Sequence, residues 1–103
     1  MILTVIGRNI EVTEAIKKYL DKKINKTFQC INDNTNIHVS LHVQKHRHIA
    51  EVTAKTKGFT AYAGQETRDL YTTMDRVLEK ISKQLKKYKE RTQNQKSKIS
   101  LNE

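Results

Sequence analysis

The sequence contains no proline and no tryptophan, and it has only one cysteine and three glycines among its 103 residues. Without proline there is no rigid linker to divide the chain, and the length favours one domain with a modest core. The single cysteine, Cys30, excludes an intrachain disulfide and fits a reducing cytoplasm. No apolar run approaches the roughly 18 residues of a transmembrane helix. The N-terminal segment also lacks the basic start and long apolar stretch of a signal peptide.

Acidic residues are scarce relative to basic ones. Lysine and arginine number 20 against 11 aspartates and glutamates, so the formal net charge is +9. A basic excess of this kind predicts a polyanionic partner, which could be RNA, DNA or an anionic membrane surface. Membrane-surface helices expose Trp, Phe or Leu to lipid, whereas the apolar residues of this chain are needed for its core. We therefore expect a nucleic acid and no membrane partner.

The spacing of apolar residues predicts the element order β-α-β-β-β-α. Residues 2–6 form a short apolar strand, and Thr13 is a good N-cap for a helix over residues 13–28 with apolar residues every four positions. Alternating apolar and polar residues predict three more strands, and a stripe with a period near 3.6 predicts a long last helix. These elements span residues 37–43, 50–55, 59–63 and about 66–91.

This order predicts an α+β fold with two layers. Three consecutive strands favour antiparallel pairing through short turns such as Lys57-Gly58, and the first strand, joined through a helix, can lie parallel to a neighbour. The expected architecture is a four-stranded sheet with both helices packed on one face. We expect one domain over residues 1–91 and a flexible tail over residues 92–103, where the periodicity is weak.

Basic residues form a row on each predicted helix. In the last helix the row lies roughly 130° from the centre of the apolar stripe. Its members are Arg76, Lys80, Lys83, Lys87 and Arg91, with Lys86 and Lys89 on the other flank. The first helix carries Lys18, Lys22 and Lys26 opposite its apolar face, flanked by Lys17 and Lys23. Because both helices lie on one side of the sheet, the rows predict a continuous cationic surface with a groove between the helices.

The type of basic residue indicates which polyanion is bound. The row on the last helix is mostly lysine, which makes point-charge contacts to phosphate rather than bidentate contacts to bases. A surface that reads phosphate spacing and groove shape suits structured RNA better than the major groove of DNA. The sequence has no RNP-type aromatic motif.

No group of residues in the sequence indicates catalysis or a metal site. His38 and His42 would lie about 13 Å apart on an extended strand, too far to share one zinc ion. No cysteine or acid pair completes a site with His46 and His48. The helix dipole explains the acids in the first half of the last helix, which are Glu66, Asp69, Asp75 and Glu79. We predict no metal, no cofactor and no enzyme activity; the rival from another class is a nuclease or metal-dependent enzyme.

Three segments carry a resemblance to a known family. They are GRNIEVTEAIKKYLDKKI, the K-x-x-H at Lys45 and His48, and DLYTTMDRVLEKISKQLKKYKER. The chain resembles the short type of ribosome hibernation promoting factor, related to the ribosome-associated inhibitor protein Y, over residues 1 to about 92. The resemblance implies a fold similar to a double-stranded RNA-binding domain. It also implies binding in the decoding channel of the small ribosomal subunit, where the domain overlaps the paths of mRNA and of tRNA in the A and P sites.

The resemblance also implies which basic residues contact RNA. The positions that match the family are Lys17, Lys23, Lys26, Lys45, Lys80, Lys83, Lys87, Lys89 and Arg91. The helical rows add Lys22, Arg76 and Lys86 to the predicted site, and these three are less secure as family positions.

The partners implied by the resemblance are the small subunit with its 16S rRNA and the 70S ribosome, bound in the cytoplasm by a monomeric protein of the stationary phase. The chain is too short for the dimerising domain of long-type relatives, so we expect ribosome pairing to need a separate partner such as the ribosome modulation factor. A short, mildly basic tail favours this subtype over the protein Y type, which stabilises inactive 70S monomers. A free double-stranded RNA-binding module is a further alternative, although the acidic start of the last helix counts against it.

Overall fold

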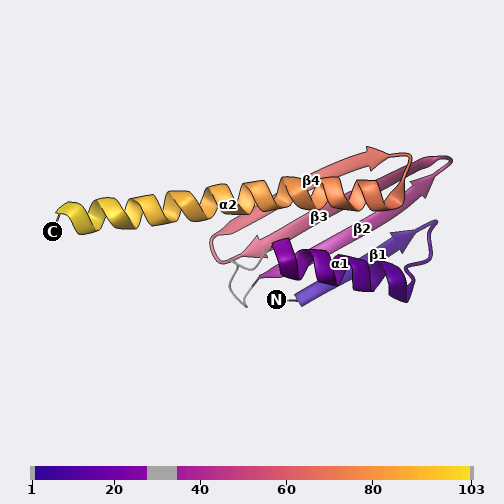
Figure 1. Ribbon diagram of the computed structural model, residues 1–103, viewed down its shortest axis with the longest axis horizontal. Coiled ribbons are helices and arrows are strands. Elements are labelled where there is room, and N and C mark those ends of the chain that lie inside the picture. The colour runs from indigo at the N-terminus through magenta and orange to yellow at the C-terminus, as the bar shows by residue number, and fades with distance from the viewer. Residues whose placement is uncertain (1, 28–34, 103) are drawn as a thin grey trace.

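The computed structural model describes the backbone of residues 2–27 and 35–102, and the side chains of residues 2–26 and 35–88. Its elements are β1 (Ile2–Arg8), α1 (Glu14–Thr27), β2 (Asn36–Gln44), β3 (Arg47–Thr56), β4 (Phe59–Thr67) and α2 (Leu70–Asn102). This is the predicted order β-α-β-β-β-α. Figure 1 shows both helices on the same face of the sheet, which confirms the two-layer α+β fold.

The four strands lie side by side in chain order, β1-β2-β3-β4. β1 runs parallel to β2, because α1 carries the chain back to the starting end of the sheet. The other two pairs are antiparallel and are joined by short turns. Lys45 in the β2–β3 turn and Gly58 in the β3–β4 turn have positive φ angles of 58° and 81°. The predicted turn at Lys57-Gly58 is therefore confirmed.

The core lies between the helices and one face of the sheet. Alternate residues of the strands are buried there, including Ile37, Val39 and Leu41 of β2. The buried residues of β3 and β4 are mostly alanine: Ala50, Val52, Ala54, Ala61 and Ala63. α2 crosses these two strands, and their small side chains let the helix lie close to the sheet. The predicted helical stripes supply the rest of the core, with Leu20, Ile24, Met74, Val77 and Ile81 all fully buried.

The boundary between β4 and α2 differs from the prediction. Glu66 lies in β4, paired with Ile49, and α2 begins only at Leu70. Asp69 precedes the helix as its N-cap: its Oδ2 accepts hydrogen bonds from the Thr72 backbone N–H (2.9 Å) and hydroxyl (2.8 Å). These bonds, the backbone one first, lower the pKa of Asp69. The expectation that Glu66 and Asp69 lie within the last helix was wrong, because the strand keeps its pairing with β3 as far as Thr67.

The end of α2 also differs from the prediction. The helix does not stop near Arg91 but continues to Asn102. Neither proline nor glycine follows Arg91, so the sequence has no strong helix breaker after this residue. The flexibility of residues 92–103 stays a prediction, because a helical backbone does not fix how far a segment moves. The predictions for Phe28 and Cys30 fall outside the described residues. In the part of the chain that the structure describes, no helix combines the length and apolarity needed to cross a membrane.

Candidate RNA-binding surface

The start and the apolar face of α1 determine where its lysines point. Thr13 caps the helix, accepting a hydrogen bond from the Ile16 backbone N–H at 3.3 Å. The buried face then turns the opposite side of the helix outward, and Lys18, Lys22 and Lys26 are all exposed there. Lys17 is exposed too, with its Nζ 3.8 Å from a Glu14 carboxylate oxygen one turn earlier. The predicted first row of basic residues is therefore present.

The second row follows α2. Its exposed members are Arg76, Lys80, Lys83 and Lys87, and Lys86 is exposed as well. Lys80 donates a hydrogen bond to the Gly64 carbonyl at the free edge of β4 (3.2 Å). Lys83 Nζ lies 3.4 Å from a Glu79 carboxylate oxygen, an exposed i,i+4 pair. Lys89 and Arg91 belong to the same helix, and their side chains lie outside the described part of the structure.

Side chains of α2 fix the helix along the edge of β4. The Gln84 amide donates to the Tyr62 carbonyl (2.8 Å), and its oxygen accepts from the Tyr62 backbone N–H (3.1 Å). Gln84 thus pairs with β4 as a neighbouring strand would. One turn later, the rings of Tyr88 and Phe59 stack at 4.5 Å with an interplanar angle of 5°. These contacts set the rotation of α2 and turn the row that contains Lys80 toward β4.

A polar bridge connects α2 to α1 on the opposite flank. The Tyr19 hydroxyl donates a 2.5 Å hydrogen bond to Asp75, and Lys23 Nζ lies 3.7 Å from the same carboxylate oxygen. The Tyr19 ring meets Tyr71 edge to face, with ring centroids 4.8 Å apart. The hydrogen bond to Asp75, with burial second, raises the pKa of Tyr19 to about 12. The Asp75 carboxylate therefore lies between the two basic rows, where the sequence predicted a groove.

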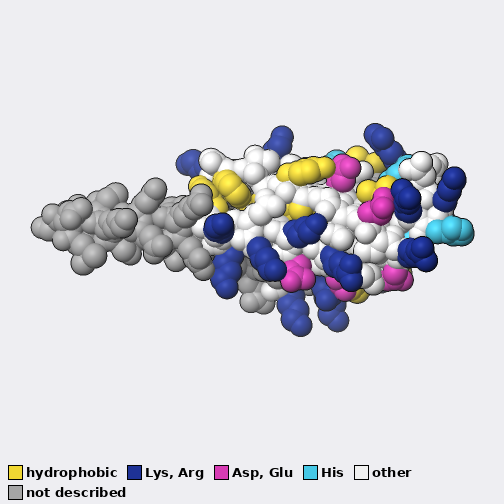
Figure 2. All heavy atoms as spheres, turned by 90° about the horizontal axis from the view of Figure 1, so that it is seen from above, with side chains coloured by type: hydrophobic (Ala, Val, Ile, Leu, Met, Phe, Trp, Pro, Cys, Tyr) yellow, Lys and Arg dark blue, Asp and Glu magenta, His cyan; other side chains and the backbone are white. Residues whose placement is uncertain are grey.

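The structure brings most of the predicted residues to the helix side of the molecule. In Figure 2 Lys and Arg side chains extend along the whole described length, with Asp and Glu side chains among them. Lys45 lies in the β2–β3 turn, at the end of the sheet where both helices begin (Figure 1). The surface is therefore two lysine-rich rows with acids between them rather than one uniform positive patch.

Sequence reasoning missed the face of the sheet that points away from the helices, which we term the open face. Alternate strand residues lie on it in register, and one row consists of Thr4, His38, Thr53 and Tyr62. The next row consists of Ile2, Asn36, Lys55 and Thr60. Tyr62 is 55% exposed. The only signal in the sequence was the period-two alternation, which did not show that an aromatic ring would lie among these polar residues.

The histidines do not form a metal centre in the described structure. Among the side chains that the structure describes, residues 2–26 and 35–88, no three His, Cys, Asp or Glu lie together so that they could hold a metal ion. His38 lies on the open face, and His48 lies near the start of α2, where its backbone carbonyl accepts a hydrogen bond from Thr73 Oγ1 (3.1 Å). The positions of these histidines do not indicate a chemical role for the K-x-x-H motif at Lys45 and His48.

Comparisons with known proteins agree with this fold. A family model described as sigma 54 modulation protein / S30EA ribosomal protein matches residues 3–93. The chain is 31% identical over 91 residues to the ribosome hibernation promoting factor of Escherichia coli, covering 88% of this chain and 96% of that protein. It is 38% identical over 88 residues to the ribosome hibernation promotion factor of Lactococcus lactis, covering 82% of this chain but only 48% of that longer protein.

Two solved structures are similar throughout the fold. The crystal structure of the Thermus thermophilus protein Y N-terminal domain superposes with a TM-score of 0.80 at 28% identity, covering 85% of this chain and 99% of that one. A ribosomal subunit interface protein from Coxiella burnetii superposes with a TM-score of 0.73 at 29% identity, covering 86% of this chain and 98% of the other.

Proposed function

Since the chain belongs to the family described as sigma 54 modulation protein / S30EA ribosomal protein, we propose that it is a ribosome hibernation factor. It binds the ribosome in the cytoplasm and inhibits translation. Relatives whose names include ribosome hibernation promoting factor support this role, and so does the likeness to a ribosomal subunit interface protein. The observation on which the proposal depends is the pair of exposed lysine-rich rows on α1 and α2.

The site of action that we propose is the decoding channel of the small subunit. The two rows contact phosphates of the 16S rRNA, and the body of the domain blocks the paths of mRNA and of tRNA in the A and P sites. Exposed lysines suit this task, because their charges follow phosphate positions without reading sequence. Inhibition then follows from occlusion alone. We propose that the protein catalyses no reaction, and measurable turnover of RNA by the purified chain would contradict this.

The residues proposed to bind RNA are those of the two rows together with the β2–β3 turn. They are Lys17, Lys22, Lys23, Lys26, Lys45, Arg76, Lys80, Lys83, Lys86, Lys87, Lys89 and Arg91. Lys80, Lys83 and Lys87 lie in the same row and are exposed, so one RNA segment can meet all three. Lys17, Lys23 and Lys83 each lie near an acid, and Lys23 is the least exposed of the three, so we expect it to contribute less than the other two.

We propose that the protein favours inactive ribosomes and forms ribosome dimers together with a separate factor such as the ribosome modulation factor. The alternative is the protein Y type of action, which stabilises inactive 70S monomers. The structural likeness to a protein Y domain favours that alternative as much as the names of the relatives favour the first. Sucrose-gradient sedimentation of ribosomes with the added protein separates the two outcomes. A free double-stranded RNA-binding module would instead bind duplex RNA as tightly as it binds intact subunits.

The role of the α2 row is tested by reversing two of its charges. Lys83→Glu/Lys87→Glu should leave the fold intact, since both side chains are exposed, and should weaken cosedimentation with small subunits severalfold or more. Losing two phosphate contacts should also lower the slope of log affinity against log salt by roughly 1.4 to 1.8. Lys83→Arg/Lys87→Arg keeps the charge, and Arg8→Glu changes an exposed charge on β1, at the edge of the sheet opposite β4, so both serve as controls. Wild-type affinity in the reversed variant, or binding insensitive to salt, would overturn the proposal.

A further inference from the structure

The open face of the sheet carries features of a binding site that the helix rows do not use. We propose that this face binds single-stranded RNA by stacking one base on Tyr62. The inference adds a second contact to the proposed function and rests on it in taking RNA as the partner. It concerns the opposite layer of the domain from the two basic rows, so it can fail or succeed independently of them.

Tyr62 presents an exposed ring from a strand whose backbone α2 holds at this point. Its side chain is 55% exposed, while its backbone N–H and carbonyl are both bound by Gln84 of α2. Gly64, the next residue of β4 on the same face, has no side chain, and the Tyr62 hydroxyl lies 4.0 Å from the point that a Cβ there would occupy. The ring therefore extends along β4 toward Gly64, and the Cγ of Glu51 lies 3.9 Å from the same point. An exposed aromatic ring on an ordered strand is the kind of surface on which an unpaired base stacks.

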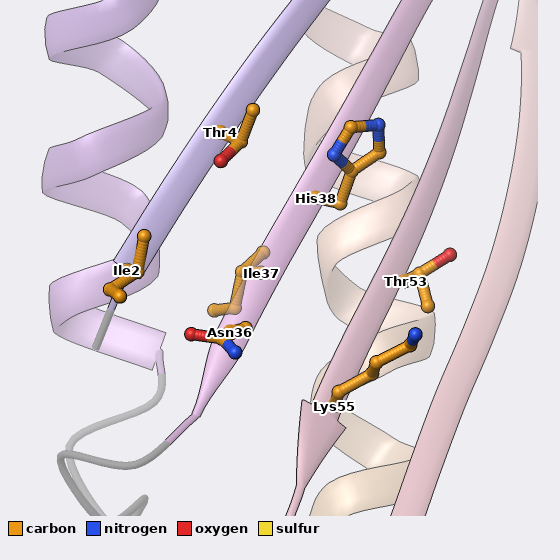
Figure 3. Close-up of a pocket in the computed structure, with 7 residues that line it drawn as sticks. All are labelled: Ile2, Thr4, Asn36, Ile37, His38, Thr53 and Lys55. Carbon is orange, nitrogen blue, oxygen red and sulfur yellow. The ribbon is translucent and has the colours of Figure 1, made fainter.

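The residues beside Tyr62 supply hydrogen-bonding groups and a positive charge. Thr53 pairs directly with Tyr62 across the strands, and His38 follows on β2. Lys55 is a diagonal neighbour of Tyr62, and such side chains begin about 7–8 Å apart. In Figure 3 the Lys55 amine extends toward Thr53, and His38 and Thr4 lie farther along the same surface. A base on the ring would thus have hydroxyl and imidazole groups beside it and an amine within reach of its phosphate.

A shallow depression adjoins Tyr62. It has a volume of about 520 Å³ and is lined by Ile2, Thr4, Asn36, Ile37, His38, Thr53 and Lys55. This volume lies within the roughly 300–1,000 Å³ range of ligand sites in proteins. Lys55 and Glu51 are the two diagonal neighbours of Tyr62 on β3, so the ring has one positive and one negative side chain beside it, and the positive one lies on the side of the depression. The nearest acid, Glu51, pairs with Gly64 beyond the Tyr62 row, where a carboxylate can accept from an exocyclic amino group of a base.

The open face is continuous with the row on α2. Lys80 belongs to that row, and its amine bonds the carbonyl of Gly64 at the free edge of β4. RNA that follows the α2 row therefore needs to cross only this edge to reach Tyr62. Double-stranded RNA would keep its bases stacked within the duplex, so the contact requires a single-stranded segment. With a single ring and no RNP-type motif, the site should accept many sequences.

Other partner classes fit this face less well. Protein interfaces bury an apolar centre rich in aromatic residues, and membrane-bound surfaces insert several large apolar side chains. On this face the large, exposed apolar residues are Ile2 and Ile6 of β1 and Tyr62 of β4, and the two isoleucines lie at the edge of the sheet opposite Tyr62, so they form no apolar centre with it. The other members of the two rows are polar or charged, which suits an RNA base and its phosphate.

The test measures binding of the full chain to a fluorescently labelled single-stranded RNA oligonucleotide by anisotropy. Tyr62→Ala should weaken binding on the order of 5- to 100-fold, the range reported for losing one base–aromatic stack. Tyr62→Phe keeps the ring and should bind within about twofold of wild type. Tyr71→Ala removes a comparably exposed tyrosine from the helix side and should leave the affinity unchanged. An RNA titration followed by backbone NMR should shift amides of the Thr53 and Tyr62 row.

Each outcome decides the proposal. It is overturned if the oligonucleotide does not bind, if Tyr62→Ala binds as wild type does, or if Tyr71→Ala is equally impaired. Parallel sedimentation with ribosomes keeps this result separate from the proposed function. Failure of the wild-type chain to bind ribosomes would refute that function. If the chain binds ribosomes but Tyr62→Ala does not weaken its binding to the oligonucleotide, only the open-face site is refuted. If Tyr62→Ala lowers ribosome affinity but not oligonucleotide affinity, this face contacts another part of the ribosome and the assignment to single-stranded RNA is wrong.

Discussion

The hydrogen bond between Tyr19 and Asp75 joins the two helices directly, although the residues are 56 positions apart in the chain. Replacing Tyr19 with phenylalanine removes only the hydroxyl, because the ring can keep its edge-to-face contact with Tyr71. The carboxylate of Asp75 then loses its short hydrogen bond but keeps Lys23 within 3.7 Å. This substitution therefore isolates the contribution of one bond to the packing of α1 against α2.

The size of the effect follows from the surroundings of the bond. A hydrogen bond to a charged group contributes roughly 1.5–3 kcal/mol when buried. Asp75 is 44% exposed, so we expect the lower end, about 1–2 kcal/mol, for Tyr19→Phe. Asp75→Ala also loses the Lys23 ion pair, which adds about 0–1 kcal/mol because both partners are partly exposed. In a domain of this size each kcal/mol lowers the melting temperature by roughly 4–8 °C.

The assay is thermal and urea unfolding of wild type, Tyr19→Phe, Asp75→Ala and the double variant. The coupling free energy of this cycle should be about 1–1.5 kcal/mol, since the singles share the hydrogen bond. The pH dependence gives a second readout. The pKa of Tyr19 is raised from 10.0 to about 12, so its contribution is complete below pH 10 and is lost as the pH rises to about 12. The stability difference between wild type and Tyr19→Phe should shrink over that interval.

Two results would refute this reasoning. One is a coupling free energy of zero, which would mean that the two side chains do not stabilise the native state through each other. The other is an ultraviolet titration in which Tyr19 ionises together with the exposed tyrosines, at its ordinary pKa. Either result would remove the bridge as the element that fixes the spacing between the α1 and α2 rows.

Two further predictions concern backbone and edge contacts. Gly7→Ala should destabilise the domain by about 1–3 kcal/mol in urea unfolding, because its Cβ would lie 2.6 Å from the Ile10 carbonyl oxygen. Gly64→Ala is the matched control, since its nearest neighbour would be 3.9 Å away, and equal destabilisation of both variants would contradict the prediction. Gln84→Ala should free the Tyr62 backbone and cost about 1–3 kcal/mol, with faster hydrogen exchange of the Tyr62 amide. Unchanged exchange would show that Gln84 does not protect the β4 edge.

The sequence determined which elements form and which side of each one is buried. Alternation in β2 and the four-residue spacing of Ile16, Leu20 and Ile24 are local patterns, so they could be read without knowing the partner of each segment. The lysine rows followed from the same periodicity, because a helix that buries one side exposes the other. The N-cap at Thr13 was equally local, and the structure confirms it.

Boundaries were less determined by the sequence. The extension of β4 to Thr67 depends on its pairing with β3, which holds Glu66 opposite Ile49 whatever the local preference for a helix. The continuation of α2 beyond Arg91 was missed for another reason, since a weak apolar period was read as the end of the helix. A helical segment that buries no side against the rest of the protein needs no apolar stripe, so its sequence does not show one.

Only the tertiary structure decided how the faces meet. Asp75 could be assigned to an exposed helix position, but its pairing with Tyr19 requires the relative placement of two helices that pack across the core. The same holds for Tyr62, whose fixed backbone depends on Gln84 reaching the β4 edge. Such contacts join residues distant in sequence, and their geometry depends on strand register and helix rotation. A one-dimensional pattern contains neither quantity, so it predicts which residues are available but not which of them come together.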